Sequence, residues 1–373
     1  MSRNLVICID GTNNYPNGGY TNIQRLCRLL QRDETQQTYY QPGVGTIEPN
    51  SLATRWGRRV AMTLDAMSGI LLQRHVCAAY RYLMAHYQPG DTLYLFGFSR
   101  GAYSARVLAG MLSKIGLLHP GFDEMVRFAW ETYIDPANRE AANNFREHYG
   151  RVVPSIRFLG LFDTVSAIGL PWVPKVFPRT FNNADVQVVR HAQALDEHRV
   201  MFVQNSWTAT PVAAAGKPPT DVQQVWFAGV HSDVGGGYAE AEAGLSRIPL
   251  AWMVREAQAA GLRFDAQACA RTLDCSAERV PDVAGVAQKF AASAPAHDEL
   301  QQRWLWKLLE WLPVPRHRRN PDDDSWYRQW RVNRGQERHL PHLPLLHDSV
   351  RVRMNGSAYR PRPLLPADPR FVV

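Results

Sequence analysis

The chain alternates between short apolar runs and polar segments that contain glycine or proline, a pattern that predicts strands separated by helices. The predicted strands are the runs at 5–9, 38–41, 93–96, 156–162 and 224–230. Helical spacing is found at 23–30, 54–87, 102–115, within 120–150, and in a segment with His191 and residues 196–199. This order predicts an α/β fold with a mostly parallel sheet and helices on both faces.

The composition changes after about residue 265, which divides the chain into two expected parts. Residues 1–264 carry the strand and helix pattern of the α/β domain. Residues 265–299 are rich in alanine, and 303–340 are dense in Trp and Arg. We therefore expect 265–373 to be a helical, Trp/Arg-rich appendage packed on the first domain, in a position to contact a membrane.

Composition and charge narrow the classes of protein further. With 45% apolar and 20% charged residues among 373, the chain can bury a large core, and wholesale disorder is excluded. The 42 basic and 34 acidic residues leave a net charge of +8, which favours anionic partners such as phospholipid headgroups or nucleic acid.

No stretch approaches 18 uncharged apolar residues, so no membrane-spanning helix is predicted. The first apolar run meets Asp10 too soon for a signal peptide, so we expect the protein to be cytoplasmic where it is made. The five cysteines are expected to be buried free thiols.

The strongest chemical signal is the pattern Gly97-x-Ser99-x-Gly101, which lies directly between a predicted strand and a predicted helix. A serine on such a turn exposes its Oγ above the carboxyl edge of the sheet, and the flanking glycines remove side chains that would collide. This context favours a nucleophilic serine over an ordinary surface serine.

A nucleophilic serine needs a base and an orienting carboxylate, and both are expected at the ends of later strands. Asp163 ends the strand at 156–162, and His231 follows the strand at 224–230. The order Ser99, Asp163, His231 is the one typical of α/β-hydrolases. His347 is the chief rival base, and Asp233 is a secondary candidate for the acid or for an ion ligand.

The oxyanion of such a reaction needs two donors, and the backbone N–H groups of Arg100 and Thr12 are the candidates. Arg100 also brings a cation beside the serine, which suits a phosphate-bearing ester. Asp10 permits a rival interpretation as the nucleophile of a phosphatase, with Asp233 as a second metal-binding acid. That chemistry normally has another acid two residues after the nucleophile, where Thr12 stands. The serine mechanism needs no cofactor and no metal, so none is expected.

The segment at 300–312 carries a broad apolar face, followed by a basic cluster at 316–319. The apolar residues are Leu300, Trp304, Leu305, Leu308, Leu309, Trp311 and Leu312. The combination fits an interfacial helix on anionic lipid, and it fits equally well a helix packed on the main domain. Nucleic-acid binding is disfavoured because no DNA- or RNA-binding module is recognisable.

Six ordered motifs resemble the bacterial α/β-hydrolase family of uncharacterised domains that includes type VI secretion phospholipase effectors. They are DGTNN at 10–14, YQPGVGT at 40–46, GFSRGA at 97–102, FDTV at 162–165, ALDEHR at 194–199 and GVHSDVGGGY at 229–238. The resemblance covers about residues 4–255 and 347–350. It implies a serine esterase acting on phospholipids, with Ser99, Asp163 and His231 as its triad. It also implies export by a contractile secretion machine, with secretion-machine and immunity proteins as partners.

These observations predict that 1–264 is an α/β-hydrolase catalytic domain that cleaves phospholipid esters through an acyl-enzyme. The alternative is a catalytically silent membrane- or protein-binding module on the same fold.

Overall fold

The computed structural model describes residues 2–11, 19–43, 70–135, 139–165, 177–208, 219–274, 282–291, 293–302, 304–319 and 326–373. Its centre is an eight-stranded sheet in the order β14-β13-β9-β8-β7-β4-β1-β3, and every neighbouring pair is parallel. The strands are β1 (Asn4–Ile9), β3 (Gln36–Gln41), β4 (Thr92–Phe98), β7 (Ile156–Phe162), β8 (Val186–Ala194), β9 (Asp221–Phe227), β13 (Leu345–His347) and β14 (Arg370–Val372). The predicted α/β class is thereby confirmed.

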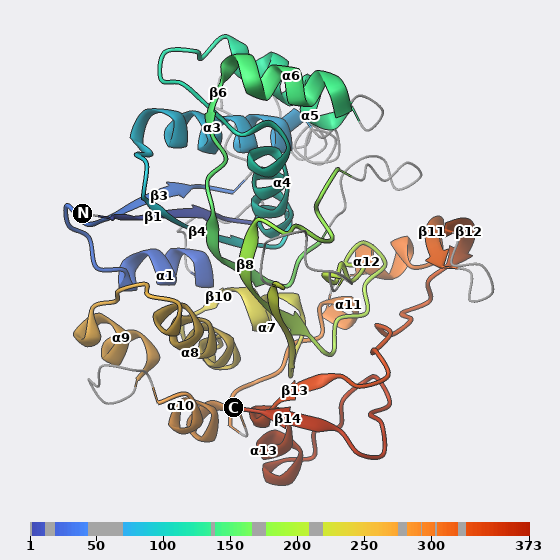
Figure 1. The fold of residues 1–373 in the computed structure, drawn as a ribbon. Coiled ribbons are helices and arrows are strands. Elements are labelled where there is room, and N and C mark those ends of the chain that lie inside the picture. The colour runs from blue at the N-terminus through green and yellow to red at the C-terminus, as the bar shows by residue number, and fades with distance from the viewer. Residues whose placement is uncertain are drawn as a thin grey trace, which may run out of the picture.

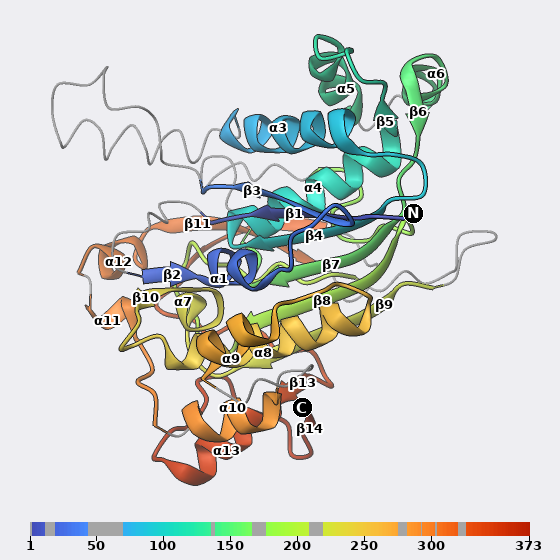
Figure 2. The ribbon, with the colours of Figure 1, turned by 90° about the vertical axis from the view of Figure 1, so that its left-hand side faces the viewer.

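Helices cover both faces of this sheet (Figures 1 and 2). One face carries α3 (Ile70–His86) and α4 (Arg100–Ile115), with α5 (Met125–Ile134) and α6 (Arg139–Tyr149) outside them. The other face carries α1 (Asn22–Leu29), α8 (Gly244–Ala259), α9 (Ala266–Leu273) and α10 (Val283–Phe290). The remaining described helices are α7 (His231–Gly235), α11 (Glu299–Gln302), α12 (Trp304–Leu309) and α13 (Asp348–Gly356).

Three two-stranded ribbons complete the described elements. They are β2 (Gly19–Thr21) with β10 (Gly236–Ala239), β5 (Leu117–Leu118) with β6 (Gly150–Val152), and β11 (Pro313–Arg319) with β12 (Trp326–Val332).

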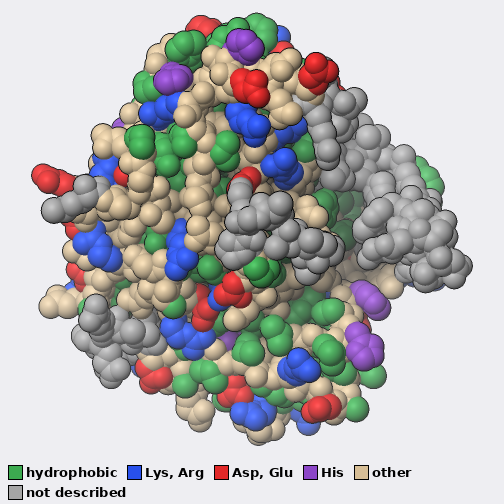
Figure 3. All heavy atoms as spheres, viewed as in Figure 1, with side chains coloured by type: hydrophobic (Ala, Val, Ile, Leu, Met, Phe, Trp, Pro, Cys, Tyr) green, Lys and Arg blue, Asp and Glu red, His purple; other side chains and the backbone are tan. Residues whose placement is uncertain are grey.

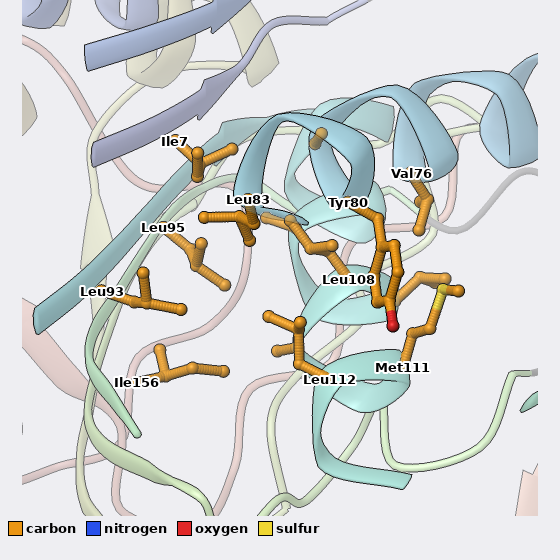
Figure 4. Packing of buried hydrophobic residues seen from close by; sticks show 14 of the residues in the cluster. Ile7, Val76, Tyr80, Leu83, Leu93, Leu95, Leu108, Met111, Leu112 and Ile156 are labelled. Atoms are coloured by element: carbon orange, nitrogen blue, oxygen red, sulfur yellow. The ribbon is translucent and has the colours of Figure 1, made fainter. Parts of the chain in front are cut away.

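The continuous apolar runs arise because alternate residues of one strand enter two different cores. In β1, Leu5 and Ile7 belong to the cluster on the α3/α4 face, whereas Val6 and Cys8 belong to the cluster on the α1/α8 face. Figure 4 shows side chains from β1, β4 and β7 meeting those of α3 and α4. A strand that is buried on both sides cannot show the polar alternation of a half-exposed strand, so its position at the centre of the sheet follows from its sequence.

The sequence expectation of a helix through His191 is wrong, because residues 186–194 form β8 at the centre of the sheet. Polar residues are unusual in a buried strand, but Arg190 and His191 each have specific partners. Arg190 pairs with Asp221 and Glu256, both at 2.7 Å. His191 Nε2 accepts from the Thr164 N–H at 3.2 Å. Partnering of this kind makes polar burial in a strand tolerable.

The appendage also adds to the sheet, which was not expected. Its short strands β13 and β14 extend the sheet beyond β9, and α13 follows β13 directly. The predicted helix at 300–312 is instead the two short helices α11 and α12, followed by the β11–β12 ribbon. Within the described ranges, no helix is both long enough and apolar enough to cross a membrane. Four cysteines, Cys8, Cys27, Cys77 and Cys269, are buried free thiols as predicted, and Cys275 lies outside the described residues.

The strand order reverses direction between β1 and β4. From β1 the chain moves to β3 on one side, and from β4 onward it moves to the other side. Ligands of open α/β sheets bind at such a point, outside the carboxyl ends of the strands. Ser99 and the Asp10-Gly11 pair follow these two strands directly.

Candidate active site

Ser99 occupies the sharp turn between β4 and α4. Its backbone φ of +58° and ψ of −124° are strained for an L residue and persist only where the surroundings enforce them. The Ser99 N–H donates to the Phe162 carbonyl at 3.0 Å, and the Ser99 carbonyl accepts from the Val165 N–H at 3.3 Å. The turn is therefore tied on both sides to the end of β7, and its side chain lies at the positive end of α4.

The two glycines of the motif are required by close backbone approach. A Cβ at Gly97 would lie 2.5 Å from the Ala102 Cα, and one at Gly101 would lie 2.5 Å from the Asp10 carbonyl oxygen. Both distances are shorter than a Cβ atom can approach a nonbonded atom. The glycines therefore let the turn close tightly and bring the loop after β1 against it.

Asp163 follows β7 on the same edge of the sheet and also has a positive φ, +37°. Its backbone N–H donates to the Ala192 carbonyl at 2.7 Å. Its carboxylate accepts from the Ala194 N–H at 2.9 Å and from His231 Nδ1 at 2.6 Å. Arg338 adds two further hydrogen bonds, at 2.5 and 2.9 Å. Burial alone would raise the pKa of Asp163, but the charge of Arg338 and the hydrogen bond from His231 hold that pKa well below its ordinary value.

His231 is the first residue of α7 and faces Asp163 from the end of β9. Because the ionised carboxylate accepts at Nδ1, that nitrogen carries the proton and Nε2 is left with its lone pair. The ring is buried between Phe98 and Phe202, with ring centroids 4.7 and 4.8 Å away. Burial lowers the pKa of His231 by more than the Asp163 carboxylate raises it, so the neutral base form is favoured.

Phe98 precedes Ser99 directly, so its stacking on the His231 ring brings the histidine to the serine turn. No hydrogen bond joins Ser99 Oγ to the His231 ring in the described part of the chain. Catalytic hydrogen bonds of this kind often tighten only when substrate binds.

His347, the rival base predicted from the sequence, caps a helix instead of facing Ser99. It caps the N-terminus of α13, where its Nδ1 accepts from the Ser349 N–H at 3.2 Å, and its ring stacks on Phe227 at 4.7 Å. Burial, together with the charge of Arg255, lowers its pKa to about 3. In the described structure its contacts include neither Ser99 nor Asp163, so the geometry favours His231 as the base.

The other sequence candidates are also engaged elsewhere. Asp233 does orient a histidine, but that histidine is His297 of the appendage, with Nδ1 at 2.7 Å, and not His231. Asp10 accepts from the hydroxyls of Thr21 at 2.7 Å and Tyr40 at 2.9 Å. Its carboxylate is therefore a buried anchor for the loop after β1, which disfavours its role as a phosphatase nucleophile. Among the described residues, no group of three His, Cys, Asp or Glu side chains is arranged to hold a metal ion.

One of the two predicted oxyanion donors, the Arg100 N–H, lies within the described residues. The Arg100 N–H lies in the first turn of α4, directly after Ser99. Thr12 lies outside the described residues, and its neighbour Gly11 ends the described loop beside the serine turn. Burial lowers the pKa of the Arg100 guanidinium to about 10, which leaves it cationic at neutral pH.

Comparison with known proteins now identifies the family. Residues 3–256 match the family model described as "T6SS, Phospholipase effector Tle1-like, catalytic domain". The chain belongs to this family. The resemblance carried by the six motifs is thereby confirmed.

Individual relatives of this Tle1-like domain extend beyond its length. It is 38% identical over 228 residues to "Uncharacterized protein YEL023C" of Saccharomyces cerevisiae, which is 56% of this chain and 33% of the yeast protein. A crystal structure of an uncharacterized protein from Pseudomonas aeruginosa matches with 21% identity and a TM-score of 0.44, over 78% of this chain and 53% of that one. The Tle1 effector bound to the VgrG spike of the type VI secretion system matches with 22% identity and a TM-score of 0.36, over 66% and 53%. The chain thus spans a third to about half the length of these proteins.

Arg338 is a residue of the site that sequence reasoning missed, and it lies outside the matched range 3–256. It is separated from Asp163 by 175 residues and stands in a polar loop of the appendage, without a motif around it. Glu197 was also missed as a site residue. Its carboxylate accepts from the His231 N–H at 3.2 Å and pairs with Arg199 at 2.6 Å. For Glu197 a signal was present, because the ALDEHR motif at 194–199 contains it.

The appendage also presents exposed apolar side chains on α12, directly after α12, and on β12. Leu308, Trp311, Leu312 and Trp330 are 46–63% exposed, and we name these four residues the Trp-rich surface. Trp306 of α12 contacts Phe202 edge-on at 5.6 Å, and Phe202 contacts His231. Aromatic packing therefore connects α12, which carries Leu308 of the Trp-rich surface, to the candidate base. Lys and Arg side chains are spread over the face in Figure 3 and do not form one continuous patch among its described residues.

Proposed function

We propose that this Tle1-like domain is a phospholipase-type carboxylic ester hydrolase that acts through Ser99, His231 and Asp163. The observation that carries the proposal is the 2.6 Å hydrogen bond between His231 Nδ1 and Asp163 beside a strained serine turn. The family description, which names phospholipase effectors, supports the substrate class.

In the proposed reaction, His231 Nε2 takes the proton of Ser99 Oγ as that oxygen attacks the ester carbonyl carbon. The Arg100 N–H and a donor from the Thr12 segment stabilise the oxyanion of the tetrahedral intermediate. The intermediate collapses when the imidazolium gives its proton to the leaving alcohol oxygen and the carbon–oxygen bond breaks. His231 Nε2 then takes a proton from a water molecule as the water oxygen attacks the acyl-serine carbonyl carbon. The second tetrahedral intermediate collapses when the bond from carbon to Ser99 Oγ breaks and the imidazolium returns its proton to Oγ, which releases the fatty acid and restores Ser99.

The electrostatics of the site support these roles. The depressed pKa of Asp163 keeps it ionised, so it can hold the Nδ1 proton and stabilise the imidazolium that forms. The lowered pKa of His231 keeps its Nε2 unprotonated at neutral pH, as a general base requires. Arg100 supplies a cation close to the serine, where the phosphate of a lipid headgroup would lie.

The Trp-rich surface supports a phospholipid bilayer as the source of the substrate. Tryptophan and leucine side chains insert readily at the boundary between headgroups and acyl chains. The surrounding segment adds cations, among them Lys307, which is exposed, and Arg334, which lies over the Trp311 ring at 5.1 Å. We propose that this surface contacts an anionic membrane and brings the nearby site to its substrate.

Delivery by a type VI secretion system into a target cell, with secretion-machine and immunity proteins as partners, belongs to the same proposal. It rests on the family description, which names that system. Co-purification of this chain with the spike proteins of its own host tests it, and loss of the hydrolase from the secreted fraction of a spike-deficient strain would agree with it.

The deciding experiment measures hydrolysis of short-chain esters and of phospholipid vesicles by the purified chain and by Ser99→Ala. We expect Ser99→Ala and His231→Ala each to lose about 10³-fold or more in kcat. Ser293→Ala, which alters an exposed serine whose hydroxyl donates to the Lys289 carbonyl at 2.8 Å, is the matched control and should keep full activity. Full activity in Ser99→Ala would end the proposal, and vesicle binding without hydrolysis by the unaltered chain would favour the silent binding module instead.

A further inference from the structure

Arg338 is the only residue of the described appendage that bonds to the carboxylate of Asp163. Its Nη1 lies 2.5 Å from Asp163 Oδ1, and its Nη2 lies 2.9 Å from Oδ2. Two parallel hydrogen bonds of this kind fix the plane of the carboxylate as well as its position. The same guanidinium donates to the carbonyls of Ala194 at 3.0 Å and Phe202 at 2.9 Å, so its own place is defined by four bonds.

We propose that Arg338 is a positioning residue of the hydrolase, which holds Asp163 in the orientation that receives His231. The inference rests on the proposed function and extends it, since it makes the appendage part of the catalytic machinery. Asp163 Oδ2 receives both the Arg338 Nη2 and the His231 Nδ1 hydrogen bonds, so the arginine and the histidine share one oxygen.

The loop that carries Arg338 is itself built to hold a fixed shape. Arg334 and Gly335 both have positive φ, +54° and +69°, which makes a tight reversal. The buried Glu310 accepts from the Gly335 N–H at 2.8 Å and from the Asn333 amide. Asn333 in turn donates to the His198 carbonyl at 2.9 Å. Because these hydrogen bonds fix the loop at Asn333 and Gly335, the Arg338 side chain is held in place before a substrate binds.

Glu310 also joins this loop to the hydrolase domain, because it accepts from the Val200 N–H at 2.6 Å. The same residue lies directly before Trp311 and Leu312 of the Trp-rich surface. The Arg338 loop, the end of α12 and the loop after β8 are therefore one hydrogen-bonded unit around the candidate acid.

The charged groups around His231 determine how its pKa changes when Arg338 is replaced. Asp163 lies at Nδ1, Glu197 accepts from the backbone N–H, and Arg199 lies behind Glu197. Arg338 neutralises part of the Asp163 charge, and without it the whole negative charge acts on the imidazole. The imidazolium then becomes more stable, so the pKa of His231 rises.

The test compares the pH dependence of kcat/KM in the full chain and in Arg338→Met. We expect a loss of about 10- to 100-fold in kcat, together with a shift of the acidic limb to higher pH by about one pH unit. The matched control is Arg353→Met, because Arg353 is equally buried in the appendage and donates to the carbonyls of Ala291 and Ala294. The control should lower the melting temperature and leave the limb where it is.

The outcomes separate the two proposals. An unmoved limb in Arg338→Met, with a rate loss like that of Arg353→Met, would overturn the positioning role while Ser99→Ala remained inactive. Full activity in Ser99→Ala would instead overturn the proposed function. If Arg338→Met does not fold, Arg338→Lys decides, since lysine keeps the charge but cannot bond both oxygens. A lowered kcat with an unmoved limb supports the inference in that variant, and wild-type kcat overturns it.

Discussion

Trp311 is the residue whose replacement tests membrane contact most directly. It is 63% exposed, directly follows the buried Glu310, and carries Arg334 over its ring. Replacement by serine removes the apolar area. The hydrogen bonds to the Glu310 carboxylate stay in place, because the backbone N–H groups of Val200 and Gly335 donate them. The perturbation therefore changes the surface and leaves the site behind it in place.

The expected magnitude follows from the exposed area. A tryptophan side chain presents about 150–250 Å², so at 63% exposure roughly 130 Å² of Trp311 is free to enter a membrane. At about 25 cal/mol per Å² this is worth about 3 kcal/mol. Since each 1.4 kcal/mol is tenfold in affinity, complete insertion corresponds to about 100-fold. Because part of the ring stays in the headgroup layer, we expect Trp311→Ser to weaken vesicle binding by about 10- to 100-fold.

The assay measures co-sedimentation with anionic vesicles and, in parallel, hydrolysis of a water-soluble short-chain ester. Phe128→Ser is the matched control, because Phe128 is an exposed aromatic, 54% accessible, on α5, which lies at the top of the molecule in Figure 1, apart from α12. Trp311→Ser should lose vesicle affinity and keep its rate on the soluble ester, whereas Phe128→Ser should keep both. Equal vesicle affinity for Trp311→Ser and the unaltered chain, or an equal loss in Phe128→Ser, would refute the assignment of the surface.

Four further predictions concern the site. Asp163→Asn leaves the Arg338 charge buried without its partner, so unfolding measurements should show a loss of about 3–5 kcal/mol, and adding Arg338→Met should restore part of it. Because the pKa of Asp163 is depressed on folding, its contribution is complete above about pH 4 and is lost as the pH falls further, so the unaltered chain should lose more stability on acidification than Asp163→Asn. Gly101→Ala, whose new methyl would meet the Asp10 carbonyl at 2.5 Å, should lower the melting temperature and abolish hydrolysis; near-normal kinetics would contradict the tight-turn argument. Since burial lowers the pKa of His231, the acidic limb of kcat/KM should lie below the ordinary histidine value of about 6.5, and a limb above that value would count against His231 as the base.

Five of the eight strands of the sheet could be predicted from the sequence, and the candidate triad could be proposed from it, because the signals for both are local. An apolar run that is buried on both faces, followed at once by a glycine-flanked serine, defines both β4 and the turn after it. Asp163 and His231 follow strands of the same kind, and parallel strands bring their carboxyl ends to one edge. The order of Ser99, Asp163 and His231 along the chain then leaves few alternatives for the acid and the base.

The remaining features depend on contacts that are distant in sequence. β8 was predicted as part of a helical segment with His191. Only the partners of Arg190 and His191 on β9, α8 and the loop after β7 explain how these polar residues lie in a buried strand. β13 and β14 have three residues each, too few for a periodic pattern. Arg338 gives no signal at all, because its role exists only when its loop meets Asp163.

The position of Arg338 so late in the chain has a consequence for protein synthesis. When the ribosome has completed residue 264, it has already made the serine, the aspartate and the histidine of the candidate site. The arginine that bonds to the aspartate is still 74 residues away, and the strands that complete the sheet edge come later still. A nascent chain that carries all three candidate residues therefore still lacks the Arg338 hydrogen bonds to Asp163. On the proposed positioning role, we expect hydrolysis only after the appendage has emerged and docked.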